Sequence, residues 1–217
     1  MSLEAKDLYA ALMHELKNNL GLLSMAMERI PRQEDPVHDG PLDEARMLCE
    51  QVIERLRQSL LLYKAVDKTL AVDIDAYSPG ELLQEMRDEA ASLARGRLEV
   101  HTEVDTGVPP IWFFDRNLVD IALTNAIQNS LGYAKTRIDL HASMVDGMLC
   151  LAVRDDSDGF PAHILEALAS GAPFHASGTG LGLRLSQMIA EAHTNKGRVG
   201  ELRLANDPGA TFSLLLP

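Results

Sequence analysis

The stretch that decides the fold is SGTGLGLRLSQMIAEAH, residues 177–193. Glycines alternate at 178, 180 and 182, and the apolar side of the helix that follows is formed by Leu183, Leu185, Met188 and Ile189. Glycines before a helix expose backbone N–H groups at the positive end of the helix dipole, which favours a bound anion. A helix cap without a ligand rarely needs three glycines, so we expect a phosphate-binding loop; a plain turn is the alternative.

Two other stretches are able to contact the same ligand. In NLVDIALTNAIQNSLGYA, residues 117–134, Asn125 and Asn129 share one helical face, and amide oxygens are acceptable ligands for Mg²⁺. In VRDDSDGFP, residues 153–161, a strand runs into Asp155, and Gly159 allows a ligand to approach the backbone closely. A carboxylate at the end of a strand is able to accept a hydrogen bond from an exocyclic amine. Surface asparagines and an acidic turn are the alternative interpretations.

The pattern around these stretches predicts an α/β sandwich. Strands are expected where β-branched residues or alternation occur, at 97–104, 111–114, 136–143, 148–155, 200–205 and 210–216. Helices are expected at 79–95, 115–132 and 180–193. No G-x-G-x-x-G follows a first strand and no Walker sequence occurs, so neither a Rossmann fold nor a P-loop fold fits.

The N-terminal part has a different, purely helical pattern. Apolar residues spaced alternately four and three apart form a heptad seam from Tyr9 to Ile30, and a similar seam runs through the expected second helix, from about Leu42 to Val66. Two long helices joined by the polar loop 31–41 make an antiparallel hairpin. Two such hairpins would close a four-helix bundle, so a homodimer is expected; packing of the hairpin on its own chain is the alternative.

We therefore expect three segments: the helical hairpin 1–68, a linker 69–78, and a second domain 79–217. The second domain starts cleanly, because Ser78 is expected to cap a helix that begins at Pro79, with Glu81 completing a capping box.

Composition limits the class of protein. The net charge of −12 and the pI near 4.9 argue against non-specific binding to nucleic acid or to a membrane surface. No apolar stretch approaches the length of a membrane span, and no signal peptide is recognised. Cys49 and Cys150 lie far apart within apolar runs and are expected to be reduced core residues, which favours a cytoplasmic location.

The order of the motifs resembles a known family. HELKNNL, residues 14–20, precedes N-x-x-x-N, D-x-x-x-G, G-x-G-x-G and a final DPGATFSLLLP. Nearly the whole chain is similar to a two-component sensor histidine kinase. The resemblance implies an α+β protein with a dimerisation and phosphotransfer hairpin, followed by a Bergerat-type ATP-binding domain of the gyrase, chaperone, histidine kinase and mismatch-repair ATPase class.

The resemblance also implies roles for individual residues. His14 would be the phosphoacceptor, Glu15 the general base, and Asn18 the residue that orients water for dephosphorylation of a partner. Asn129 would hold Mg²⁺, and Asp155 would read the adenine amine of ATP. The remaining residues expected at the nucleotide are Asn125, Tyr133, Gly159, Gly178, Thr179, Gly180, Leu181, Gly182 and Thr211.

The implied function is ATP-dependent autophosphorylation of His14 and transfer of the phosphoryl group to an aspartate of a response regulator receiver domain. Three positions depart from the family pattern: Ser157 replaces a glycine of the aspartate motif, Gly132 replaces a basic residue, and Asn19 stands where proline is common. The segment between Gly159 and Gly178 also indicates an abbreviated lid. These departures favour the alternative, a weak or lapsed kinase that acts as a histidine phosphotransferase or as a response-regulator phosphatase or binding module.

Overall fold

In the computed structural model, the described residues are 70–170 and 181–217, together with isolated helical positions between Leu16 and Leu61. The chain divides into two compact units, Met1–Thr69 and Leu70–Pro217. In the first unit, the thiol of Cys49 donates a hydrogen bond to the carbonyl of Leu20 at 3.4 Å. The expected interhelical loop 31–41 and a dimeric four-helix bundle lie outside the described residues and stay predictions.

The second unit contains all the described strands. Its elements are β1 (Asp75–Tyr77), α3 (Pro79–Ala94), β2 (Glu99–Val104), β3 (Trp112–Phe114), α4 (Arg116–Tyr133), β4 (Arg137–Val145), β5 (Met148–Asp155), α5 (Ala162–Ser170), α6 (Leu181–Ala192), β6 (Thr194–Asn195), β7 (Arg198–Val199), β8 (Glu201–Asn206) and β9 (Ala210–Leu216).

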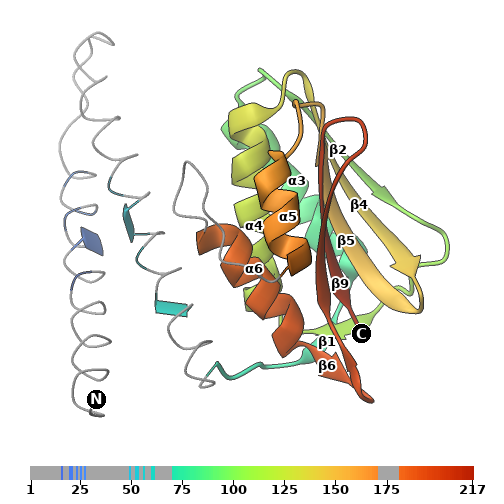
Figure 1. Ribbon diagram of the computed structural model, residues 1–217. Coiled ribbons are helices and arrows are strands. Elements are labelled where there is room, and N and C mark those ends of the chain that lie inside the picture. The colour runs from blue at the N-terminus through green and yellow to red at the C-terminus, as the bar shows by residue number, and fades with distance from the viewer. Residues whose placement is uncertain are drawn as a thin grey trace, which may run out of the picture. The chain divides into compact units, whose positions relative to one another are not determined.

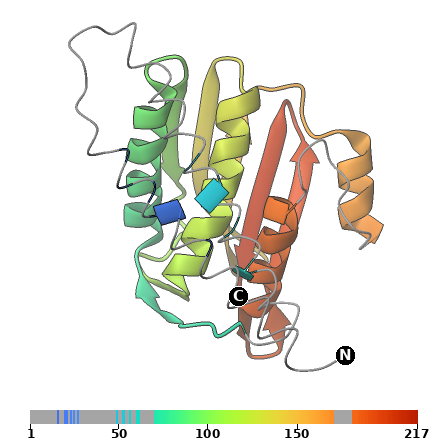
Figure 2. The same ribbon diagram turned by 90° about the vertical axis from the view of Figure 1, so that its left-hand side faces the viewer.

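A five-stranded sheet in the order β2-β4-β5-β9-β8 forms the centre of this unit. Only the β2–β4 pair is parallel; the other three pairs are antiparallel. The helices lie together on one face of the sheet (Figure 1). Figure 2 shows that face, with α3, α4 and α6 side by side, and both neighbouring pairs of these helices are in contact. The unit is therefore a two-layer α/β sandwich, as the sequence predicts.

Alternation along the strands separates the two faces of the sheet. In β4, Ile138, Leu140 and Ala142 are at most 1% exposed and point towards the helices, whereas Arg137 and His141 point the other way. We call the second face the open face. On it, a small apolar cluster of Met148, Cys150, Ala152 and Leu215 is buried, with Val145 packed against it. Cys49 and Cys150 are both free thiols and both buried, as expected for core residues.

Most element boundaries agree with the sequence. β5 spans the expected residues, and the hydroxyl of Ser78 caps α3 by accepting a hydrogen bond from the Glu81 amide at 3.3 Å. The sequence missed four short elements, β1, α5, β6 and β7. α5 lies in the segment after Gly159, where the sequence analysis expected no helix, and the abbreviated lid stays a prediction. β1 pairs with β3 although it lies within the expected linker.

No helix among the described residues is long and apolar enough to cross a membrane.

Candidate functional site

Asp155, the last residue of β5, is a carboxylate held by several donors. It is 8% exposed. Its Oδ2 atom accepts a hydrogen bond from the hydroxyl of Ser130 on α4 at 2.6 Å. Its Oδ1 atom accepts from the amides of Ser157 at 3.0 Å and of Ala210 at 3.3 Å. A buried carboxylate needs such donors because it has given up water. The three bonds fix the direction in which its remaining acceptor positions point.

The turn after Asp155 is closed by Ser157, which replaces the expected glycine. The amide of Ser157 donates to Asp155, and its hydroxyl accepts from the amide of Gly159 at 3.1 Å. Ser157 is 9% exposed, so the turn accommodates this side chain in its interior. The serine hydroxyl therefore adds one hydrogen bond to the turn, and its side chain fits there.

Gly159 has to be a glycine in this turn. Its φ is +87°, and a Cβ atom would lie 2.6 Å from side-chain atoms of Asn206. Asn206, from the end of β8, accepts from the amide of Phe160 at 2.7 Å and donates to the carbonyl of Phe160 at 2.9 Å. Asn206 thus holds the chain as it leaves the turn. Sequence reasoning missed this role because 46 residues separate the two partners.

Asp156 points away from Asp155 and has a structural role. Its carboxylate accepts hydrogen bonds from the amides of Lys135, Thr136 and Arg137 and from the hydroxyl of Thr136. These donors, above all the Thr136 hydroxyl, hold the pKa of Asp156 well below its usual range. Asp156 therefore ties the end of β5 to the connection between α4 and β4.

The asparagines of α4 lie along the helix beside the start of α6. Asn125 is buried and Asn129, one turn later, is exposed. A Cβ atom added to Gly182 would lie 3.4 Å from Cγ of Asn125, so the first turn of α6 packs against this amide. Tyr133, at the end of α4, is 70% exposed. The structure thus brings Asn125 and Gly182 together, and Ser130 of the same helix joins Asp155.

Thr211 is not brought to this site. It lies in β9 directly opposite Arg154, whose exposed side chain is on the open face of the sheet. Residues paired in a ladder point to the same face, so Thr211 faces away from Asp155. The neighbouring Ala210, whose amide bonds Asp155, occupies the position beside the carboxylate.

Several expected site residues lie outside the described residues. They are His14, Glu15, Asn18, Gly178, Thr179 and Gly180. Leu181 begins α6, but its side chain is also outside the description.

A second buried network, which the sequence did not indicate, joins the far end of α6 to the start of α4. His193 is 2% exposed; its Nδ1–H donates to the carbonyl of Ile189 at 2.7 Å, and its Nε2 accepts from the amide of Asp115 at 3.0 Å. Asp115 caps α4 through the Leu118 amide and accepts from the amide of Asp73 at 2.8 Å. Burial lowers the pKa of His193, which keeps the imidazole neutral. This histidine is therefore a structural group.

The geometry on the helical face suits a purine nucleotide. The remaining acceptor positions of Asp155 are able to read an exocyclic amine. The exposed amide of Asn129 is available to a hard cation, and the N-terminus of the 12-residue helix α6 lies beside Asn125.

Comparison with known proteins supports this interpretation. Residues 115–217 match the family described as "Histidine kinase-, DNA gyrase B-, and HSP90-like ATPase". The matched part runs from the N-cap of α4 through β9. The expected resemblance to the ATP-binding domain of two-component sensor kinases is confirmed.

The curated relatives are sensor kinases. The signal transduction histidine-protein kinase AtoS of Escherichia coli K12 is 28% identical over 233 residues, which cover 97% of this chain and 34% of AtoS. The sensory histidine kinase/phosphatase NtrB of Escherichia coli O157:H7 is 25% identical, covering 98% of this chain and 62% of NtrB. The chain therefore spans between a third and two thirds of the length of these relatives.

Two solved structures share the fold. The crystal structure of full-length ShkA in complex with AMPPNP has a TM-score of 0.74 and 20% identity, covering 97% of this chain and 45% of that one. The Acinetobacter baumannii histidine kinase AdeS has a TM-score of 0.61 and 15% identity, covering 94% of both chains.

Proposed function

We propose that this chain is the kinase core of a two-component sensor. It would phosphorylate itself on His14 with ATP and pass the phosphoryl group to an aspartate of a response regulator receiver domain. The observation that carries the proposal is the buried Asp155, held by Ser130, Ser157 and Ala210 within a domain of the histidine kinase-like ATPase family.

Nucleotide binding would use the helical face of the sheet. Asp155 would accept a hydrogen bond from the adenine amine, and Gly159 would lie against the base. The helix dipole of α6 and the glycines before it would stabilise the phosphates. ShkA, which shares the fold, was solved with the ATP analogue AMPPNP, which is consistent with this assignment.

Asn129, with Asn125 one turn earlier, would hold Mg²⁺ through its amide oxygen. The fit rests on residue chemistry: the amide of Asn129 is exposed, and oxygen atoms are the ligands that Mg²⁺ prefers. Mg²⁺ in this position would neutralise charge on the phosphates during transfer.

The phosphoacceptor belongs to the first unit, and its assignment rests on the sequence. A neutral imidazole beside a carboxylate is a competent nucleophile near neutral pH, so His14 would attack while Glu15 takes its proton. Homodimerisation through the heptad seams and a cytoplasmic location are parts of the same proposal.

A second candidate is a histidine phosphotransferase or response-regulator phosphatase with little kinase activity. The relative NtrB is named a kinase/phosphatase, and Asn18 is the residue that would orient water for this reaction. The intact bonding around Ser157 favours the kinase, because the departure that suggested a lapsed nucleotide site is accommodated in the turn.

The test is incubation with γ-labelled ATP and Mg²⁺ of the wild type, His14→Gln and a control, His163→Gln. His163 is an exposed histidine on α5, so its replacement leaves the proposed phosphoacceptor in place. Acid-labile, alkali-stable label on the wild type and the control, but not on His14→Gln, is expected. Label that persists in His14→Gln would refute the phosphoacceptor. Absence of label from a folded wild type that still dephosphorylates a regulator would favour the second candidate.

A further inference from the structure

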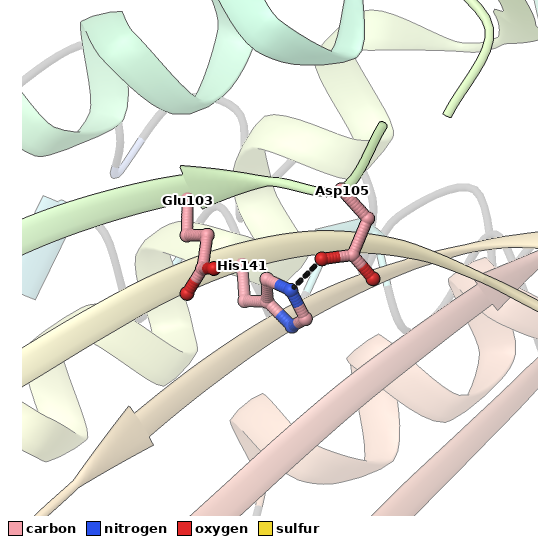
Figure 3. A group of neighbouring side chains, drawn as sticks. All are labelled: Glu103, Asp105 and His141. Carbon is pink, nitrogen blue, oxygen red and sulfur yellow. Dashed lines mark hydrogen bonds and ion pairs between the residues drawn. The ribbon is translucent and has the colours of Figure 1, made fainter. Parts of the chain in front are cut away.

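Three side chains of metal-ligand type meet on the open face of the sheet, near its β2 edge (Figure 3). Glu103 and Asp105 come from β2 and the residue after its end, and His141 comes from β4. One ligand atom from each side chain lies within 4.8 Å of the other two. We call these residues the edge cluster.

The backbone ladder brings the three residues together. Glu103 lies directly opposite His141 in the parallel β2–β4 pair, and residues paired in this way point to the same face. The Asp105 amide donates to the carbonyl of Ala142 at 2.9 Å, which continues the ladder by one residue. Asp105 is two residues after Glu103 and so returns to the same side. Because Leu140 and Ala142 are buried under the helices, His141 is fixed on the open face.

The separation of His141 and Asp105 is close to that of two ligands of one cation. The Nε2 atom of His141 lies 2.9 Å from Oδ1 of Asp105. Two ligands that bind one zinc ion at about 2.0–2.2 Å are themselves roughly 3–3.5 Å apart, so a small adjustment would place an ion between them. The side chain of His141 is 15% exposed, which restricts its rotamers. A hollow lined by Glu103, Asp105, Thr106 and Met144 leaves room for water ligands.

A neighbouring group on the same strands shows what is different about the edge cluster. His101 lies opposite Asp139 in the ladder, but the Asp139 carboxylate forms an ion pair with Arg137 at 2.7 Å. In the described part of the chain, no lysine or arginine forms an ion pair with Glu103 or Asp105. Within the described residues, the only ion-pair contact of these two carboxylates is therefore the one inside the edge cluster, between Asp105 and His141.

We propose that Glu103, Asp105 and His141 bind one divalent transition-metal ion of the Zn²⁺ type, with water completing its coordination. One imidazole nitrogen and two carboxylate oxygens form a donor set that suits Zn²⁺, whereas Mg²⁺ and Ca²⁺ prefer sites made of oxygen alone. The site lies on the opposite face of the sheet from Asp155, so it is separate from the proposed nucleotide site. A bound ion would cross-link the edge strand β2 to β4.

The test is calorimetric titration of the full chain with Zn²⁺, without nucleotide, for the wild type, His141→Gln and the control His101→Gln. His101 is an exposed histidine on the same pair of strands, and its ring contacts Glu99. His101→Gln therefore removes one histidine, as His141→Gln does, but leaves the edge cluster intact. We expect His141→Gln to lose a binding event that the wild type and His101→Gln retain, with an affinity at least about tenfold weaker at this site.

Two further measurements distinguish metal binding at the edge cluster from metal binding at other histidines. Co²⁺ bound in place of Zn²⁺ should give ligand-field absorption bands that Glu103→Gln and His141→Gln weaken and His101→Gln leaves unchanged. Zn²⁺ should raise the melting temperature of the wild type more than that of His141→Gln. Equal Zn²⁺ titrations and equal Co²⁺ spectra for the wild type and His141→Gln, with native circular dichroism for both, would overturn the proposal.

Discussion

The two faces of the sheet carry polar side chains of different kinds. On the helical face they are few and buried, and two of them have several protein partners: Asp155 accepts three hydrogen bonds, and His193 uses both ring nitrogens. On the open face they are exposed and paired singly, as in the ion pair of Glu201 and Arg203. The first arrangement fixes the position of a functional group, whereas side chains in the second arrangement are hydrated and held by a single contact.

The difference predicts where substitutions matter. Removing one partner of a buried hydrogen bond lowers the free energy of unfolding by about 1–3 kcal/mol, because the remaining partner is left buried without a hydrogen bond. An exposed ion pair contributes about 0–1 kcal/mol. Changes that break the helical-face bonds should therefore have larger effects than changes of similar size on the open face.

The largest effect is expected for Gly209→Ala, which disturbs the backbone beneath Asp155. Gly209 has a φ of +89°, and a Cβ atom there would lie 2.0 Å from the carbonyl oxygen of Asp155. Strain and collision together should lower the free energy of unfolding by roughly 2–4 kcal/mol. Urea denaturation measures the change.

The matched control is Gly132→Ala in α4. Nothing lies within 4 Å of the added Cβ atom, and helical alanine is favoured over glycine by about 1 kcal/mol. The control should therefore be neutral or stabilising. If both variants lost the same stability, the close approach at Gly209 would not be a constraint.

Ser130→Ala should have the next largest effect, because it removes the hydroxyl that holds Asp155. We expect a loss of about 1–3 kcal/mol in unfolding free energy and weaker ATP binding. Ser170→Ala is the control, since the hydroxyl of this serine donates to the carbonyl of Glu166 but the residue is exposed, at the end of α5. Melting curves and ATP titrations for both variants check the prediction, and an unchanged ATP affinity for Ser130→Ala would contradict it.

A smaller, pH-dependent effect is expected from His193. Burial lowers its pKa below the value of about 6.5 that it has when unfolded, so the unfolded chain binds the proton more readily. Stability should therefore fall as the pH drops below about 6.5, by at most about 1.4 kcal/mol per pH unit from this group.

The measurement is the melting temperature between about pH 7.5 and pH 5.5 for the wild type, His193→Gln and His163→Gln. His193→Gln should be less stable at the higher pH but should show a shallower decline, whereas His163→Gln should follow the wild type. Parallel curves for all three proteins would show that His193 does not control this pH dependence.

The smallest effect is expected on the open face, for Arg203→Gln. Its partner Glu201 is exposed, although the hydrogen bond from Arg203 lowers the pKa of that carboxyl. The free energy of unfolding should change by about 0.5 kcal/mol or less. If Arg203→Gln lowered the free energy of unfolding as much as Ser130→Ala does, the two faces would not differ in their sensitivity to substitution.

The sequence predicts what depends on local pattern. β5 is predictable because an apolar run ends at a charged turn. The cap at Ser78 is predictable because serine, proline and glutamate in this order are typical of the start of a helix. The contacts of Asp155 with Ser130 and Ala210, and of Asn206 with Phe160, join residues 25 to 55 apart, so only the fold reveals them.

Two of the differences have local causes. β1 has the sequence DAY, which is too short and too polar for a strand pattern, and it is a strand because β3 pairs with it. Thr211 was expected beside the nucleotide, but the period of two in β9 turns it to the open face.

The central claim, that the helical face binds ATP through Asp155, is tested most directly by titrating ATP and Mg²⁺ into three proteins: the wild type, Asp155→Asn and Asp139→Asn. Asp139 is an aspartate of the same sheet whose side chain lies on the open face. The account predicts that Asp155→Asn weakens ATP binding by at least about tenfold, the loss of one hydrogen bond to a charged group, while Asp139→Asn binds ATP as the wild type does. Equal affinity of Asp155→Asn and the wild type would contradict it.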